Sequence, residues 1–283
     1  MAILARWAQA ASNHAPAQSS AERRCPALLA FGAERLIGVV DGLVDLFNKL
    51  LADTNAKPRS QLAEYHQAMA TAANDNVPLV CDAGLVQIDI VAYDGLDEMD
   101  AFGPLEVFRS AEAAGADITA RLVTRVPSEQ VTGAFGLRFC PDATYGLGAD
   151  VLVVPGGGWA TRAERGAWAE VQDGSWLPML AAAAREVRII AGVCTGTMLL
   201  AHAGVVGTRR ASTHHTALAD LGATGAKVVN ERVVDDGDLL TCGGVTAGID
   251  LALWVVERFT DHEFADGLAR RMEYPRVRPV QAA

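Results

Sequence analysis

One cysteine stands where a nucleophile would be placed. Cys194 lies in Ile189–Gly196, where an apolar run leads into the pattern Gly-x-Cys-x-Gly. Flanking glycines allow a sharp turn from a strand into a helix, which is the layout of a nucleophile elbow with Cys in place of Ser. Positive partial charge at a helix N-terminus favours a thiolate. The pattern therefore predicts a reactive thiol, and a buried cysteine in a tight turn is the alternative.

Two further segments contain groups that could act with this thiol. Gly156, Gly157 and Gly158 follow another apolar run, and glycines let backbone N–H groups approach a ligand closely, as an oxyanion hole requires. Asp100 lies in Glu98–Pro104, after an earlier apolar run. A carboxyl group beside a thiolate is a proton donor with a raised pKa, because two like charges disfavour each other. The alternative role for Asp100 is a helix cap.

Alternating strands and helices would bring these segments together. The apolar patterns predict strands and helices in the order Leu85–Ala92 (strand), Gly103–Ala114 (helix), Thr119–Thr124 (strand), Val151–Val154 (strand), Leu177–Arg185 (helix), Val187–Val193 (strand), Met198–Ala203 (helix), Val228–Val229 and Leu239–Thr241 (strands), Ile249–Phe259 and Glu263–Met272 (helices). This order predicts an α/β fold with a parallel sheet covered by helices on both faces. In such sheets ligands bind outside the carboxyl ends of the strands, where the three segments lie.

Composition narrows the class of protein. The 283 residues correspond to one large domain or two small ones. The chain has 24 Lys+Arg against 34 Asp+Glu, a net charge of −10, which argues against a nucleic-acid partner. No uninterrupted apolar run reaches the roughly 18 residues of a membrane span. Five cysteines without a CxxC pair argue against a disulfide scaffold or a metal site and for a cytoplasmic location.

The beginning of the chain differs from the rest. We predict that residues 1–80 form a partly disordered N-terminal extension and that residues 81–283 form the α/β domain. Within the extension, apolar residues at three- and four-residue steps over 34–52 predict an amphipathic helix that packs on the main domain or on a partner chain. Residues 53–78 read as a linker. Met69 inside it could be an alternative start, which an intact-mass measurement on the native protein would reveal.

Residues 85–274 resemble the ThiJ/PfpI superfamily, which is related to class I glutamine amidotransferase domains. The resemblance rests on six segments, Glu98–Pro104, Val153–Gly158, Val193–Gly196, Arg209–His214, Asn230–Val234 and Thr241–Asp250. The Cys-Thr-Gly elbow, the Met-Asp-x-x-Gly-Pro motif and the Gly-Gly-x-Thr-Ala-Gly-Ile-Asp loop are most similar to isocyanide (isonitrile) hydratases. The resemblance implies a flavodoxin-like sandwich of helices around a parallel sheet, with a nucleophile elbow.

The resemblance also implies roles for individual residues. Cys194 matches the nucleophile, and Asp100 matches the acidic residue that contacts it. Gly157 and Thr195, beside Gly156, match the positions whose backbone N–H groups hold the developing charge. Because Thr195 stands where the protease-like branch has a histidine, a Cys-His peptidase mechanism is not expected.

Histidines and other side chains remain open to two interpretations. His214 matches a histidine near the nucleophile in several branches, and a locally satisfied histidine is the alternative. His215 makes a metal pair conceivable, although adjacent side chains diverge on a strand. Trp159 could line the pocket or belong to the core. Cys140 and Cys242 are expected as small buried residues.

The resemblance implies an enzyme that hydrates isocyanides to N-substituted formamides through a Cys194 thioimidate, without a metal or an organic cofactor. Its partners would be a small-molecule substrate and a second copy of the chain in a homodimer, with no nucleic acid and no membrane. The alternative is a stress or regulatory protein whose Cys194 is oxidised. A glyoxalase or deglycase is a third possibility, which Asp rather than Glu at position 100 disfavours.

Overall fold

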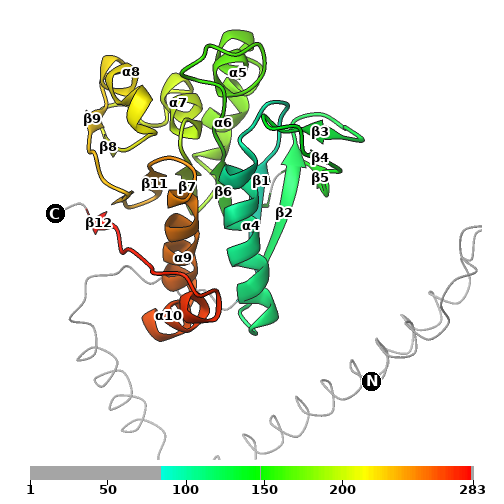
Figure 1. The fold of residues 1–283 in the computed structure, drawn as a ribbon, viewed down its shortest axis with the longest axis vertical. Helices are drawn as coiled ribbons and strands as arrows, with labels where there is room; N and C mark the ends of the chain where they lie inside the picture. Colours follow the sequence, from blue (N-terminus) through cyan, green and yellow to red (C-terminus); the bar gives the residue numbers. More distant parts are fainter. Residues whose placement is uncertain (1–83, 147, 282–283) are drawn as a thin grey trace, which may run out of the picture. The chain divides into compact units, whose positions relative to one another are not determined.

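The computed structural model describes residues 84–146 and 148–281 (Figure 1). The expected N-terminal extension over 1–80, its helix over 34–52, the linker over 53–78 and the start at Met69 lie outside the described residues and stay predictions. Within the described part of the chain, no helix combines the length and apolar character needed to cross a membrane.

A mostly parallel sheet forms the centre of the domain. Its strands lie in the order β12 (Val280–Gln281), β10 (Val233–Asp236), β11 (Leu239–Cys242), β7 (Ile189–Gly192), β6 (Val151–Val154), β1 (Val86–Val91), β2 (Ile118–Thr124) and β5 (Ala143–Thr144). All neighbouring strands run parallel except β10 and β11, which are antiparallel. The predicted α/β class is therefore confirmed, with one antiparallel pair that the sequence did not indicate.

Helices pack around this sheet in two groups. The helices are α4 (Glu98–Ala113), α5 (Ala167–Asp173), α6 (Leu177–Ala183), α7 (Gly196–His202), α8 (Leu218–Ala223), α9 (Ala247–Phe259) and α10 (His262–Arg271), with a 3₁₀ turn at His215–Ala217. Helices α4, α9 and α10 contact one another, and α5 and α6 each contact α7 (Figure 1). Every residue of β6 and β7 is buried, as expected for parallel strands covered on both sides.

Two small sheets lie outside the central one. Strands β3 (Val131–Thr132) and β4 (Arg138–Phe139) form an antiparallel pair, and β8 (Arg210–Ala211) pairs with β9 (Lys227–Val228). The strand expected near Val228 thus belongs to a separate pair and not to the main sheet. Cys140 directly follows β4 and is exposed, so its predicted burial is wrong, because this short hairpin has little structure to cover it. Cys242 is buried as expected.

The start of α4 differs from the prediction in a way that matters for the site. The helix begins at Glu98, not at Gly103, and Pro104 lies inside it. Asp97 is the cap, and its Oδ1 accepts a hydrogen bond from the Met99 N–H at 3.1 Å. Asp100 is therefore not the cap but a residue of the first helical turn, where its side chain is free for another role.

Candidate active site

The elbow around Cys194 is a strained turn held from both sides. Cys194 has φ +54, a left-handed conformation that is uncommon for residues other than glycine. Its N–H donates to Gly243 O at 3.1 Å, and its carbonyl accepts from Thr213 Oγ1 at 2.8 Å. A Cβ at Gly196 would stand 1.9 Å from Val154 O, so only glycine fits there. The turn predicted from Gly-x-Cys-x-Gly is present in the structure.

Asp100 and Cys194 lie together beneath this turn. The Asp100 side chain is fully buried, and its Oδ2 accepts from the Gly156 N–H at 3.0 Å. Its Oδ1 is buried and has no hydrogen-bond partner among the described residues. The carboxyl group and the Cys194 thiol lie near enough for each to affect the pKa of the other, so the structure places the predicted acid beside the predicted nucleophile.

Burial controls the protonation of this pair. Removal from water raises the pKa of Asp100 to about 8, and the neighbouring Asp97 adds to this while the Gly156 N–H opposes it. Burial also raises the pKa of Cys194, followed by the effect of Asp100, whereas the N–H groups of Thr195 and Val245 lower it. The expected helix-terminus effect on the thiol is therefore outweighed by burial, and Asp100 retains a proton at neutral pH.

The backbone N–H groups are arranged differently from the expectation. The Gly157 N–H donates to Thr195 Oγ1 at 2.9 Å, so it is directed at a side chain and not at the thiol. The Gly156 N–H is directed at Asp100. Near the sulfur lie the N–H groups of Thr195, which was expected, and of Val245, which was not. Val245 has φ +51, and no local sequence signal indicates such a conformation for a β-branched residue.

A cavity of about 180 Å³ opens onto Cys194. Its walls include Asp97, Trp159, Thr195, His214 and Val245. Trp159 fulfils both expected roles, since it lines this cavity and is buried, and its Nε1 donates to Asp220 Oδ2 at 2.7 Å. The size of the cavity suits the reacting end of a small molecule.

His214 lies in this cavity and is also satisfied locally. The Thr216 N–H donates to its Nδ1 at 3.3 Å. Burial lowers the pKa of His214, and the adjacent His215 adds to this effect, so the ring is neutral at pH 7. The two rings do not diverge as expected, since their centroids are 4.2 Å apart. Among the described residues, no group of three His, Cys, Asp or Glu side chains could hold a metal ion.

Comparison with known proteins gives consistent matches. The model of the DJ-1/PfpI family matches residues 86–258. An isonitrile hydratase from Pseudomonas putida is 32% identical over 201 residues, which cover 70% of this chain and 82% of that protein. The crystal structure of a ThiJ/PfpI family protein from Pseudomonas syringae has a TM-score of 0.60 and 28% identity, covering 81% of this chain and 86% of that one. DJ-1beta from Drosophila melanogaster, at 20% identity and a TM-score of 0.58, covers 67% of this chain and 98% of its own, and shares the fold.

Proposed function

The chain belongs to the DJ-1/PfpI family, and from this premise we propose that it is a cysteine-dependent hydratase that converts isocyanides to N-substituted formamides. The observation that carries the proposal is the buried Asp100 carboxyl beside the Cys194 thiol. The similarity to an isonitrile hydratase supports it. A carbon-centred, weakly basic substrate suits a soft sulfur nucleophile beside a proton donor.

In the first step the thiol adds across the terminal carbon of the isocyanide, R–N≡C. As the sulfur of Cys194 forms a bond to that carbon, Asp100 gives its proton to the same carbon and takes up the proton of the thiol. The product is the thioimidate R–N=CH–S–Cys, and Asp100 is again protonated. The pKa of Asp100, raised to about 8, keeps the required proton on this group at neutral pH.

In the second step water adds to the thioimidate carbon. Asp100 gives its proton to the nitrogen and takes one from the water, giving R–NH–CH(OH)–S–Cys. As the C=O bond forms and the C–S bond breaks, Asp100 takes the hydroxyl proton and gives a proton to the departing sulfur. The N-substituted formamide leaves, and the pair regains its starting protonation. The net reaction adds one water to one isocyanide and consumes no cofactor.

Two other chemistries are less well supported by the geometry. A Cys-His peptidase needs a histidine that activates the thiol, but position 195 is threonine and His214 accepts from Thr216. Oxidative sensing favours an accessible thiolate, whereas Cys194 is only 6% exposed and burial raises its pKa. The absent histidine and the buried thiol both favour a reaction in which Cys194 and Asp100 keep their protons until the substrate binds.

The test is hydration of a simple aromatic isocyanide by the purified protein, with formamide measured by chromatography. Cys194→Ala and Asp100→Asn should abolish turnover while circular dichroism shows a retained fold. Cys140→Ala is the matched control, because it removes an exposed thiol outside the site and should leave turnover unchanged. Undiminished formamide formation by Cys194→Ala would exclude the mechanism.

We further propose that the chain forms a homodimer in the cytoplasm. Three apolar side chains near α4 and the β3–β4 hairpin are exposed, Met99 at 43%, Phe135 at 84% and Leu137 at 47%. Such a patch on a protein surface is typical of an interaction site. Light scattering after size exclusion should give twice the monomer mass for the wild type, and Phe135→Asp should lower it; a monomeric wild type would exclude the dimer.

A further inference from the structure

The peptide group that joins Pro155 to Gly156 accepts one hydrogen bond and donates another. It lies between the candidate site and a neighbouring cavity. The carbonyl of Pro155 accepts a hydrogen bond from Tyr93 Oη at 2.6 Å. The N–H of the same peptide, contributed by Gly156, donates to Asp100 Oδ2 at 3.0 Å. Both bonds are buried. A single rigid unit therefore connects the Tyr93 hydroxyl to the acid of the site.

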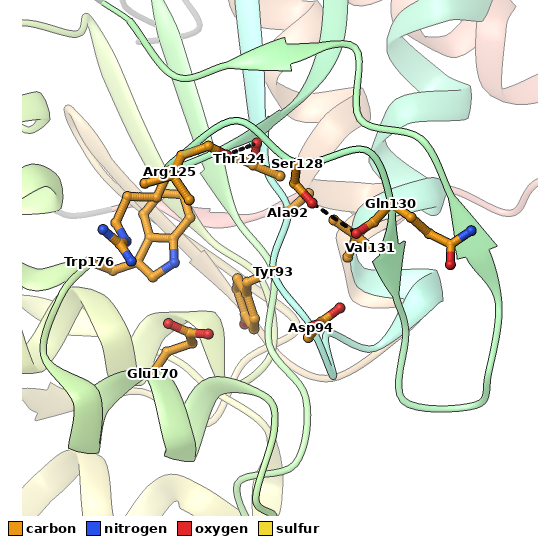
Figure 2. A pocket seen from close by; sticks show the side chains of 11 residues that line it. Ala92, Tyr93, Asp94, Thr124, Arg125, Ser128, Gln130, Val131, Glu170 and Trp176 are labelled. Atoms are coloured by element: carbon orange, nitrogen blue, oxygen red, sulfur yellow. Dashed lines mark hydrogen bonds between the residues drawn. The ribbon is translucent and has the colours of Figure 1, made fainter.

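Tyr93 is held firmly in this position. It lies two residues after the end of β1, and its side chain is 4% exposed. Its ring packs edge to face against Trp176, with the centroids 6.4 Å apart. On its other side lies a cavity of about 160 Å³ that also contains Glu170 (Figure 2). Burial raises the pKa of Tyr93 well above its usual value, so the hydroxyl keeps its proton and remains a donor around neutral pH.

The neighbouring peptides have their own partners. The Gly156 carbonyl accepts from the Asp97 N–H at 2.8 Å, and the Gly157 N–H is bonded to Thr195. Within the described part of the chain, the Pro155 carbonyl accepts only from Tyr93. Removal of the Tyr93 hydroxyl would thus release this one peptide and leave the surrounding turn in place.

The two bonds on the peptide reinforce each other. A carbonyl that accepts a hydrogen bond polarises its peptide, which makes the N–H of that peptide a stronger donor. The Gly156 N–H stabilises the ionised form of Asp100. The Tyr93 hydroxyl therefore acts on the carboxyl through the peptide, without touching the carboxyl or the substrate.

We propose that Tyr93 is a positioning residue, which holds the Pro155–Gly156 peptide and thereby fixes the orientation and proton affinity of Asp100 beside Cys194. The catalytic consequence rests on the proposed function, whereas the effect on the protonation of the pair does not.

Other titratable groups surround the Asp100–Cys194 pair and could also affect its titration. Asp97, Cys194, Cys242 and Tyr93 surround Asp100, and Glu170 faces Tyr93 from the cavity side. Apart from Tyr93 itself, none of these residues is replaced in Tyr93→Phe. A shift in the titration of the pair in that variant is therefore attributable to the lost hydroxyl.

The experiment measures the rate at which iodoacetamide alkylates Cys194 as a function of pH, by mass spectrometry of the peptide that contains it. Sulfur displaces iodide, and its proton passes to the Asp100 carboxylate or to solvent, so the rate follows loss of a proton from the pair. Tyr93→Phe should raise the midpoint by about 0.5 pH unit, as expected when a hydrogen bond to a charged group weakens by a fraction of its strength. Tyr145→Phe is the matched control and should leave the midpoint unchanged, because the Tyr145 hydroxyl makes no hydrogen bond within the described residues.

A second variant tests the proposal independently if Tyr93→Phe does not fold. The unnatural residue 3-fluorotyrosine at position 93 keeps the ring and makes the hydroxyl a stronger donor, so the midpoint should move downward. Unchanged midpoints in both variants would overturn the proposal, whatever the hydration assay gives. Opposite shifts in a protein that hydrates no isocyanide would support it and reject the proposed function. In a hydrating enzyme, Tyr93→Phe should also lower kcat more than it changes KM.

Discussion

Replacing Asp100 with asparagine should make the protein more stable and, under the proposed function, inactive. The amide has the size of the carboxyl group, and its oxygen can accept the Gly156 N–H that now donates to Oδ2 at 3.0 Å. Unlike the carboxyl group, the amide cannot ionise. Because the side chain is fully buried, that ionisation is unfavourable in the folded chain and favourable in the unfolded one.

The sign and size follow from the raised pKa. Burial raises the pKa of Asp100 from 3.8 to about 8, so between these values the folded protein binds a proton that the unfolded chain has lost. The contribution of Asp100 to stability is thus complete below pH 4 and declines as the pH rises toward 8. At about 1.4 kcal/mol per pH unit, the loss is about 2 kcal/mol at pH 5 and about 5 kcal/mol at pH 8.

The assay compares urea unfolding of the wild type and Asp100→Asn at pH 5 and pH 8. The stability advantage of the variant should grow by about 3 kcal/mol between the two conditions. Asp261→Asn is the matched control, because it makes the same change on the exposed cap of α10, where asparagine also caps well. Its difference in stability from the wild type should stay small at both pH values, since water screens an exposed charge.

One result would refute this reasoning. If the free energies of unfolding of the wild type and Asp100→Asn differed by the same amount at both pH values, the carboxyl group would ionise equally easily in the folded and unfolded chain. The proton held beside Cys194 at neutral pH would then be absent, and with it the acid that the first step of hydration requires.

Other substitutions test the packing around the site and the C-terminal segment. Gly196→Ala should lower stability by about 2 kcal/mol or more in thermal unfolding, because its Cβ would stand 1.9 Å from Val154 O, while Gly222→Ala in α8 should change little. Thr195→Val should lower the free energy of unfolding, measured in urea, by about 1–3 kcal/mol, because it leaves the buried Gly157 N–H without its acceptor. Thr195→Ser keeps the hydroxyl and should be about as stable as the wild type. Glu257→Gln should lower the free energy of unfolding by about 3 kcal/mol in the same measurement, because it removes the buried carboxylate that pairs with both Arg276 and Arg278, and Asp266 alone stays paired with Arg276; equal stability of the wild type and this variant would contradict that role.

The parts of the fold that could be predicted are those in which one local pattern decides the structure. Strand β6 occupies Val151–Val154 as predicted, since a strand buried on both faces is an uninterrupted apolar run. The elbow was also predictable, because the glycines on either side of Cys194 allow a turn that larger residues would block. The start of α4 was missed because Gly103-Pro104 resembles a helix start, although Asp97 supplies the actual cap.

The electrostatics of the site could not be predicted in the same way. The sequence places Cys194 before a helix and so suggests a lowered pKa for the thiol, but burial raises it. Burial depends on the whole set of elements packed around a residue, and no local pattern measures it. The approach of the Val245 N–H to the sulfur and the contact of Tyr93 with Pro155 join segments 51 and 62 residues apart in the chain, and such pairings have no signature in either segment.

A buried carboxyl that weakens the folded state calls for an explanation beyond packing. Asparagine would accept the same Gly156 N–H and avoid the unfavourable ionisation, so stability alone favours the amide. What only the carboxylic acid offers is a proton that can be given up and taken back near neutral pH, and its pKa of about 8 lies close to that range. Isocyanide hydration needs such a proton at its first bond-forming step and again when water adds. A feature that weakens the fold is therefore one that the proposed chemistry uses directly.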